Sequence, residues 1–167
     1  GGYLMWTLYP QYLVFWDGRQ NSPEMFKAGL QIVSRENWQE ALDRYKVNTI
    51  VTSVLADTTG ARWPLIDRLR DSERWALVFR DAWSLVFVRR ESVEPGWLQT
   101  HEQPKSGINE VILSAAPRLA EIYPWCSTAW WELTRVHTER KEYPLAAEAL
   151  DKYLLNTPSD RLSLIHI

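Results

Sequence analysis

The sequence predicts an α/β fold, in which a small mixed sheet of about four strands carries packed helices and is followed by a helical hairpin. In the first 90 residues, short runs of β-branched and aromatic residues alternate with segments of helical period. Beyond residue 107 only helical period remains. With 167 residues, the chain has room for one small domain and a helical appendage.

Apolar spacing and the positions of proline and glycine define the elements of the first region. Pro10 ends an apolar helix, and Ser22-Pro23 begins another at an N-cap. In chain order we expect helix 2–9, strand 12–16, helices 23–33 and 37–45, strand 47–54, helix 64–69, and strands 75–79 and 83–88. The connection 80–82 is so short that the last two strands must form an antiparallel hairpin. The helices between the first two strands would supply the right-handed crossover of a mixed sheet.

A domain boundary is expected at 91–107, because this stretch holds two prolines, two glycines and many polar residues. It would link an α/β domain at 1–90 to helices at 108–160. Residues 161–167 are expected to be a tail without function, either disordered or foreign to the natural protein. Because the chain opens with two glycines and lacks an initiator methionine, we expect further protein before Gly1.

Composition argues against several classes of protein. With a net charge of -2 and a pI near 6.0, the chain lacks the excess of basic residues that binding to nucleic acid would need. No run of 18 apolar residues occurs, so we expect a soluble piece that does not itself span a membrane. The single cysteine, Cys126, excludes an internal disulfide, and we expect it to be a buried thiol in a helix.

Motifs of catalysis are missing from the sequence. His101, His137 and His166 lack metal-ligand spacing, and neither GxGxxG nor GxxxxGK[ST] is present. Asp67 and Asp71 lie one helical turn apart beside arginines, so we expect surface ion pairs there. We therefore predict no catalytic residue, no metal and no cofactor. A small enzyme or small-molecule binder stays open as an alternative.

Residues 127–160 resemble a tetratricopeptide repeat. With Trp130 as the fourth residue of a unit, Leu133, Ala146 and Pro158 stand where the family has its conserved leucine, alanine and proline. Departures at Thr134, His137 and Tyr153 are typical of a terminal or degenerate repeat. One such hairpin cannot bury a continuous core, so it must pack against the α/β domain or against further repeats.

The resemblance also implies a surface that binds a protein or peptide. The family's usual geometry would place five residues on the concave side: Thr128, Trp131, Arg135, Thr138 and Glu139. A solvated face, or a face that packs on the neighbouring domain, is the alternative for these residues.

A second candidate site is the cluster Asp17, Gly18 and Arg19, which closes the expected strand 12–16. Open α/β sheets tend to bind ligands at the carboxyl ends of their strands. Gly18 permits a tight turn, and Arg19 offers a bidentate donor for phosphate or carboxylate. The alternative is a strand-ending turn with an ion pair.

The front of the chain carries a further resemblance. GGYLMW at 1–6, Tyr9-Pro10 and VFWDGR at 14–19 are similar to the extracytoplasmic tails of bacterial multi-span membrane proteins. These belong to the dolichyl-phosphate-mannose mannosyltransferase-like (GT-C type) class of lipid-linked-sugar glycosyltransferases. The likeness extends to the closing hairpin, which ends in FVRR at 87–90. In that class a membrane part precedes a soluble α/β domain, and tetratricopeptide repeats can follow.

The catalytic acids of that class lie in loops of the membrane part. The resemblance therefore implies that this chain is a non-catalytic accessory domain on the periplasmic face, whose first partner is its own membrane part. The alternative is a free-standing tetratricopeptide-type interaction module.

Overall fold

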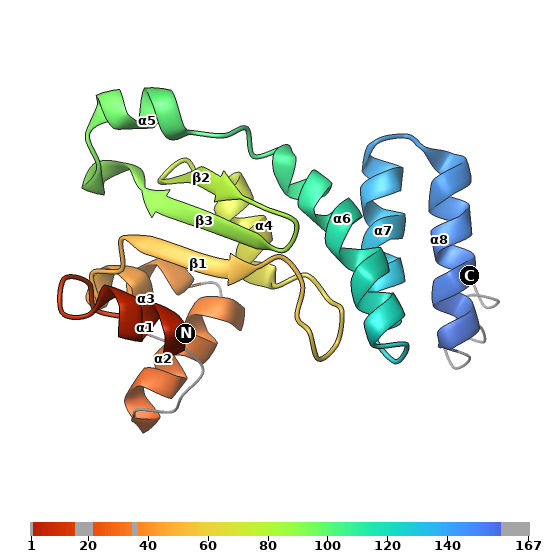
Figure 1. The fold of residues 1–167 in the computed structure, drawn as a ribbon, viewed down its shortest axis with the longest axis horizontal. Coiled ribbons are helices and arrows are strands. Elements are labelled where there is room, and N and C mark those ends of the chain that lie inside the picture. The colour runs from red at the N-terminus through yellow and green to blue at the C-terminus, as the bar shows by residue number, and fades with distance from the viewer. Residues whose placement is uncertain (1, 16–21, 35–36, 158–167) are drawn as a thin grey trace. The chain divides into compact units, whose positions relative to one another are not determined.

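A computed structural model describes residues 2–15, 22–34 and 37–157 (Figure 1). The chain divides into two compact units, residues 1–48 and 49–167. The described part of the first unit contains helices only, and the second unit holds the sheet and the other helices. Helices and strands thus occur together, as predicted, but the division falls earlier in the chain than the boundary expected at 91–107.

The first unit contains helices α1 (Gly2–Leu8), α2 (Pro23–Ser34) and α3 (Trp38–Arg44). As predicted, α2 begins at Pro23, where the backbone N–H of Met25 donates to Ser22 Oγ at 3.2 Å. The strand expected at 12–16 is absent from its described part, 12–15, and Trp16 lies outside the described residues. Phe15 instead packs on Tyr45, with ring centroids 4.4 Å apart. A short apolar run does not by itself distinguish a strand from other buried segments.

The sheet of the second unit has the strand order β1-β3-β2 among the described residues. Its strands are β1 (Thr49–Ser53), β2 (Trp75–Arg80) and β3 (Ser84–Arg89). Both pairings with β3 are antiparallel, so the predicted hairpin is confirmed. The prediction of a mixed, four-stranded sheet is wrong for the described chain. A mixed sheet would have needed a parallel pair that includes the strand expected at 12–16. In the structure, β1 and β2 run parallel to each other, but β3 lies between them, so they are not hydrogen-bonded neighbours.

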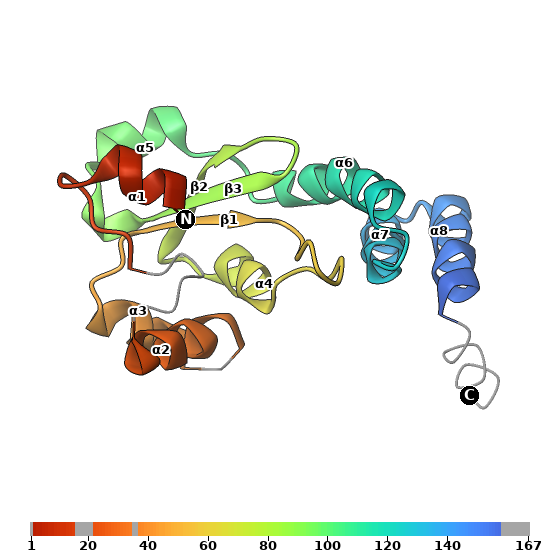
Figure 2. The same cartoon turned by 60° about the horizontal axis from the view of Figure 1, so that its bottom comes forward.

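Helices cover both faces of this sheet. Figure 2 shows the sheet between helix α4 (Pro64–Asp71) and helix α5 (Pro95–His101). Side chains alternate across a strand, and Leu85 and Phe87 of β3 are fully buried. On the other face, Ala76 and Val88 pack against Leu98 of α5.

The stretch 91–107 is therefore more than the linker that its composition predicts. It contains α5, preceded by a 3-10 turn at Arg90–Ser92. The backbone N–H of Gln103 donates to the carbonyl of Leu77 in β2 at 2.8 Å. Proline and glycine at 95–96 begin a helix here, and Leu98 is an apolar anchor that holds the segment on the sheet.

Three successive helices complete the second unit. They are α6 (Gly107–Ile122), α7 (Thr128–Glu139) and α8 (Tyr143–Asn156), and each packs on the next. The helices expected beyond residue 107 are confirmed over the described residues, and α8 ends at Asn156. The inner faces carry small residues, among them Ala115, Ala129 and Ala149, which let the helices approach closely.

Gly60 lies where the loop after β1 meets the start of α7. Its φ is +75°, and a Cβ added there would lie 2.8 Å from the backbone nitrogen of Ala129. Gly60→Ala is therefore expected to lower the free energy of unfolding by about 1–3 kcal/mol, through strain and a clash with rigid backbone. Urea denaturation followed by circular dichroism measures the change. Gly96→Ala is the matched control, because nothing lies within 4 Å of its added Cβ, and an equal loss in both variants would contradict this account.

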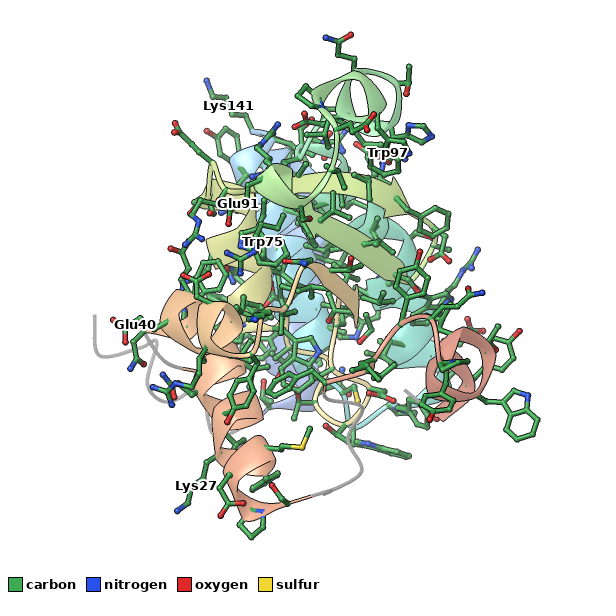
Figure 3. All side chains as sticks on the ribbon, turned by 90° about the vertical axis from the view of Figure 1, so that its left-hand side faces the viewer. Lys27, Glu40, Trp75, Glu91, Trp97 and Lys141 are labelled. Atoms are coloured by element: carbon green, nitrogen blue, oxygen red, sulfur yellow. The ribbon has the colours of Figure 1, made fainter. Side chains whose placement is uncertain are left out.

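Lys105 caps the carboxyl end of α4. Its ammonium donates to the carbonyl of Leu69 at 2.9 Å and to that of Ser72. Burial is the main cause that lowers the pKa of Lys105 below its usual value. Lys105→Met keeps the apolar stem but removes both charge-assisted bonds, and should cost about 1–3 kcal/mol in chemical denaturation. Lys27→Met, at an exposed position on α2 (Figure 3), should change stability by less than about 0.5 kcal/mol.

Candidate interaction surface

The five predicted partner-binding residues lie on α7 and divide into two groups. Thr128, Trp131 and Thr138 are half-buried or exposed. The Trp131 side chain is 40% exposed, and its ring lies 5.5 Å from that of Tyr153 on α8. Thr138 donates its hydroxyl to the Thr134 carbonyl of its own helix at 2.7 Å. This group is therefore accessible to a partner.

Arg135 and Glu139 instead face α4. Arg135 Nη2 lies 3.8 Å from a carboxylate oxygen of Asp67, and Glu139 Oε2 lies 3.9 Å from Arg70 Nη1. Glu139 also accepts a hydrogen bond from Asn109 Nδ2 at 3.1 Å. The structure thus places these two residues in contacts within the second unit, which was the alternative considered from the sequence.

A buried ion pair between Arg62 and Glu132 lies beside this group, and neither residue was predicted. The Arg62 side chain is 1% exposed, and its Nε lies 3.4 Å from Glu132 Oε2. Its Nη1 lies 3.2 Å from Asp67 Oδ1. The backbone N–H of Arg62 also donates to Glu132 Oε1 at 3.3 Å, so one glutamate of α7 holds both the main chain and the side chain of the loop.

The geometry of this cluster favours a structural role. The guanidinium nitrogens of Arg62 lie within ion-pair distance of both carboxylates but make no well-aligned hydrogen bond within the described residues. Burial lowers the pKa of Arg62 below its usual value, and the charges of Asp67 and Glu132 act in the opposite direction. A guanidinium keeps its proton across the physiological range, so it is a fixed charge here and cannot act as an acid or base.

An aromatic face extends from α7 to α8, and we define it as Trp130, Trp131, Lys152 and Tyr153. The Lys152 ammonium lies 4.6 Å from the centroid of the Trp130 ring, in cation–π contact. Trp and Tyr supply large contact area at low conformational-entropy cost, and both are enriched at protein interfaces. The composition of this face is therefore similar to that of protein interfaces.

A hollow between the β2–β3 turn and the start of α6 is a weaker candidate. It is lined by Arg80, Asp81, Gln103, Pro104, Glu110 and Val111. Arg80 donates to Gln103 Oε1 at 3.2 Å and to the Gly107 carbonyl at 3.1 Å. Asp81 accepts from two backbone N–H groups, which lowers its pKa. These charged groups are therefore engaged with the protein itself.

Exposed aromatic residues also mark the first unit, in residues 3–13. Trp6 is 88% exposed, Leu13 84% and Tyr3 78%. The apolar residues of 2–9 predict a short buried helix; the helix is present, but Tyr3 and Trp6 are exposed, so the predicted burial is wrong for them. Apolar period identifies a helix but does not show what covers it.

The other sequence predictions have mixed outcomes. Asp17, Gly18 and Arg19 lie outside the described residues. Cys126 is buried, as expected, but it lies in the loop between α6 and α7 and not in a helix, and burial raises the pKa of its thiol. In the described part of the chain, no group of three or more His, Cys, Asp or Glu side chains is placed to hold a metal ion. Nor is any described helix long and apolar enough to cross a bilayer.

Comparison of the chain with protein-family models, curated proteins and solved structures gives no match. Interpretation of the two exposed surfaces therefore depends on their chemistry and on the sequence resemblances.

Proposed function

We propose that this chain is a non-catalytic extracytoplasmic accessory domain of a membrane-embedded glycosyltransferase-like protein. In this proposal it supports the binding of an acceptor or a partner, and catalysis belongs to a membrane part that precedes Gly1. The proposed site is the periplasmic face of the membrane.

The order of the parts carries the proposal. An uncharged segment with the motif GGYLMW comes first, a small sheet whose last strand ends within the FVRR stretch follows, and a helical pair comes last. The resemblance implies a soluble α/β domain followed by tetratricopeptide repeats, and the order of the sheet and the helical pair supports this expectation. Arg62, Glu132 and Asp67 are engaged in contacts that hold α7 on the loop and α4, so we assign these charged residues a structural role in the domain.

Fractionation of the full-length gene product tests the proposal. The protein should sediment with membranes and stay there after a carbonate wash, because spanning helices resist such treatment. Recovery in the soluble fraction would overturn the proposal. Sequencing of the gene upstream of Gly1 is the complementary observation, since several apolar spans are expected there.

The alternative is a free-standing tetratricopeptide-type interaction module. The exposed Trp131 of the aromatic face favours it, because an accessible tryptophan at a helix-pair surface is a common anchor for a partner. Pull-down with the soluble protein, compared with Trp131→Ala, tests this function. Loss of a specific partner in the variant, together with a soluble full-length protein, would favour the module over the accessory domain.

A further inference from the structure

Between residues 3 and 13 lies a set of exposed, mostly aromatic side chains, which we call the aromatic front. Five large side chains in it are at least 65% exposed: Tyr3, Trp6, Tyr9, Tyr12 and Leu13. Proteins that stay monomeric in water rarely expose so many large apolar groups in one short stretch. The segment therefore needs an explanation beyond the packing of the first unit.

The chemistry of the aromatic front points to one kind of neighbour. From residue 1 to residue 16 the sequence contains no Asp, Glu, Lys or Arg. Four of the five exposed side chains are Tyr or Trp, which combine an apolar ring with a polar tip. Such side chains concentrate at the boundary between lipid headgroups and acyl chains. A packed protein core would instead favour aliphatic residues, and a nucleic acid would require cations.

Within the described residues, no helix is long and apolar enough to cross a bilayer. The described helix α1 has 7 residues and is about 10 Å long, whereas a bilayer core is about 30 Å thick. Pro10 lies two positions after the end of α1 and blocks a helical continuation. Residues 3 and 6 lie on one face of α1, because positions three apart are neighbours on a helix.

We propose that the aromatic front binds the surface of a phospholipid bilayer, with Tyr3, Trp6, Tyr9 and Leu13 inserted at the headgroup boundary. The occupant is lipid, and recognition is apolar rather than electrostatic. This inference deepens the proposed function and rests on it for its biological setting: the accessory domain would itself contact the membrane, in addition to any covalent attachment through a preceding part.

Flotation of the 167-residue chain with vesicles tests the inference. The chain should float with phosphatidylcholine vesicles, and the bound fraction should change by less than about twofold when a third of the lipid is phosphatidylglycerol, since no charge is involved. The triple variant Trp6→Ser, Tyr9→Ser, Leu13→Ser should bind at least about fivefold less. Its unchanged thermal melting would show that the fold is intact, because these positions are exposed.

Trp125→Ser is the matched control, because Trp125 is also exposed, at 71%, but belongs to the second unit. This variant should float like the parent chain. Equal binding of parent and triple variant, or no binding of the parent, would overturn the inference. Sedimentation equilibrium that shows a dimer, lost in the triple variant and without vesicle binding, would also overturn it and assign the front to a second copy.

The accessory-domain proposal and the lipid-contact inference can be overturned independently of each other. A full-length protein that stays in the membrane, together with a chain that does not bind vesicles, would remove only the lipid-contact inference. A full-length protein in the soluble fraction would remove the accessory-domain proposal whatever the vesicles show.

Discussion

Glu132→Ala is expected to lower the free energy of unfolding by about 3–5 kcal/mol. Glu132 is 4% exposed and is one of the two carboxylate partners of the buried Arg62, the other being Asp67. Without it, the guanidinium would stay buried with Asp67 as its remaining close carboxylate, and the Arg62 backbone N–H would lose its acceptor. Removal of one partner from a buried ion pair costs more than the pair itself contributes.

Urea denaturation of two further variants distinguishes the contribution of the Arg62–Glu132 ion pair from that of neighbouring charges. Glu139→Ala removes a more exposed carboxylate of the same helix, whose ion pair with Arg70 is longer, and should cost less than about 1 kcal/mol. The double variant Arg62→Met, Glu132→Leu should recover most of the lost stability, since apolar side chains of similar volume can replace a buried ion pair. A double variant as unstable as Glu132→Ala would contradict this account.

Trp75→Ala is expected to destabilise the protein by about 3–5 kcal/mol, because it removes a large side chain that is 1% exposed. Trp75 begins β2, and Figure 3 shows it within the fold beside the sheet. The guanidinium of Arg89 lies 5.1 Å from its ring centroid, so the substitution also removes a cation–π contact at a buried arginine.

Trp97 provides the control for this prediction. It lies on α5, is 39% exposed and stacks on His101 at a centroid distance of 4.2 Å (Figure 3). Trp97→Ala should therefore cost less than about 1.5 kcal/mol. Similar unfolding midpoints for the two variants would show that Trp75 does not contribute more to the core than a half-exposed tryptophan.

Local signals in the sequence were sufficient for most elements. Ser22-Pro23 located the start of α2, and the three residues 80–82 fixed the hairpin of β2 and β3. Each of these signals acts between neighbours in the chain, so no knowledge of tertiary structure is needed.

Long-range contacts account for what the sequence did not show. Leu98 packs α5 on the sheet, in a stretch that was expected to be a linker. The run 12–15 does not form the strand that its composition favours. Arg62 and Glu132 are 70 positions apart and belong to no motif, so their pairing becomes visible only once α7 meets the loop. Exposure of Trp6 is equally invisible to apolar periodicity, which identifies a helix but not its neighbours.

The five residues predicted to bind a partner do not share one environment on α7. Trp131 lies on an accessible face, whereas Arg135 and Glu139 face α4. On a helical wheel all of these positions lie on one side of α7, but part of that side faces solvent and the other part faces α4. A partner of the aromatic face would therefore meet Trp131 and Tyr153 before it met the charged residues.

Protease accessibility in intact cells is the most direct test of the accessory-domain proposal. The full-length protein is expressed in a bacterium, the outer membrane is permeabilised, and protease is added before or after lysis. The proposal predicts that residues 1–167 are cleaved before lysis while a membrane-embedded fragment survives. Protection of these residues until the inner membrane is broken would place them in the cytoplasm and contradict the proposal.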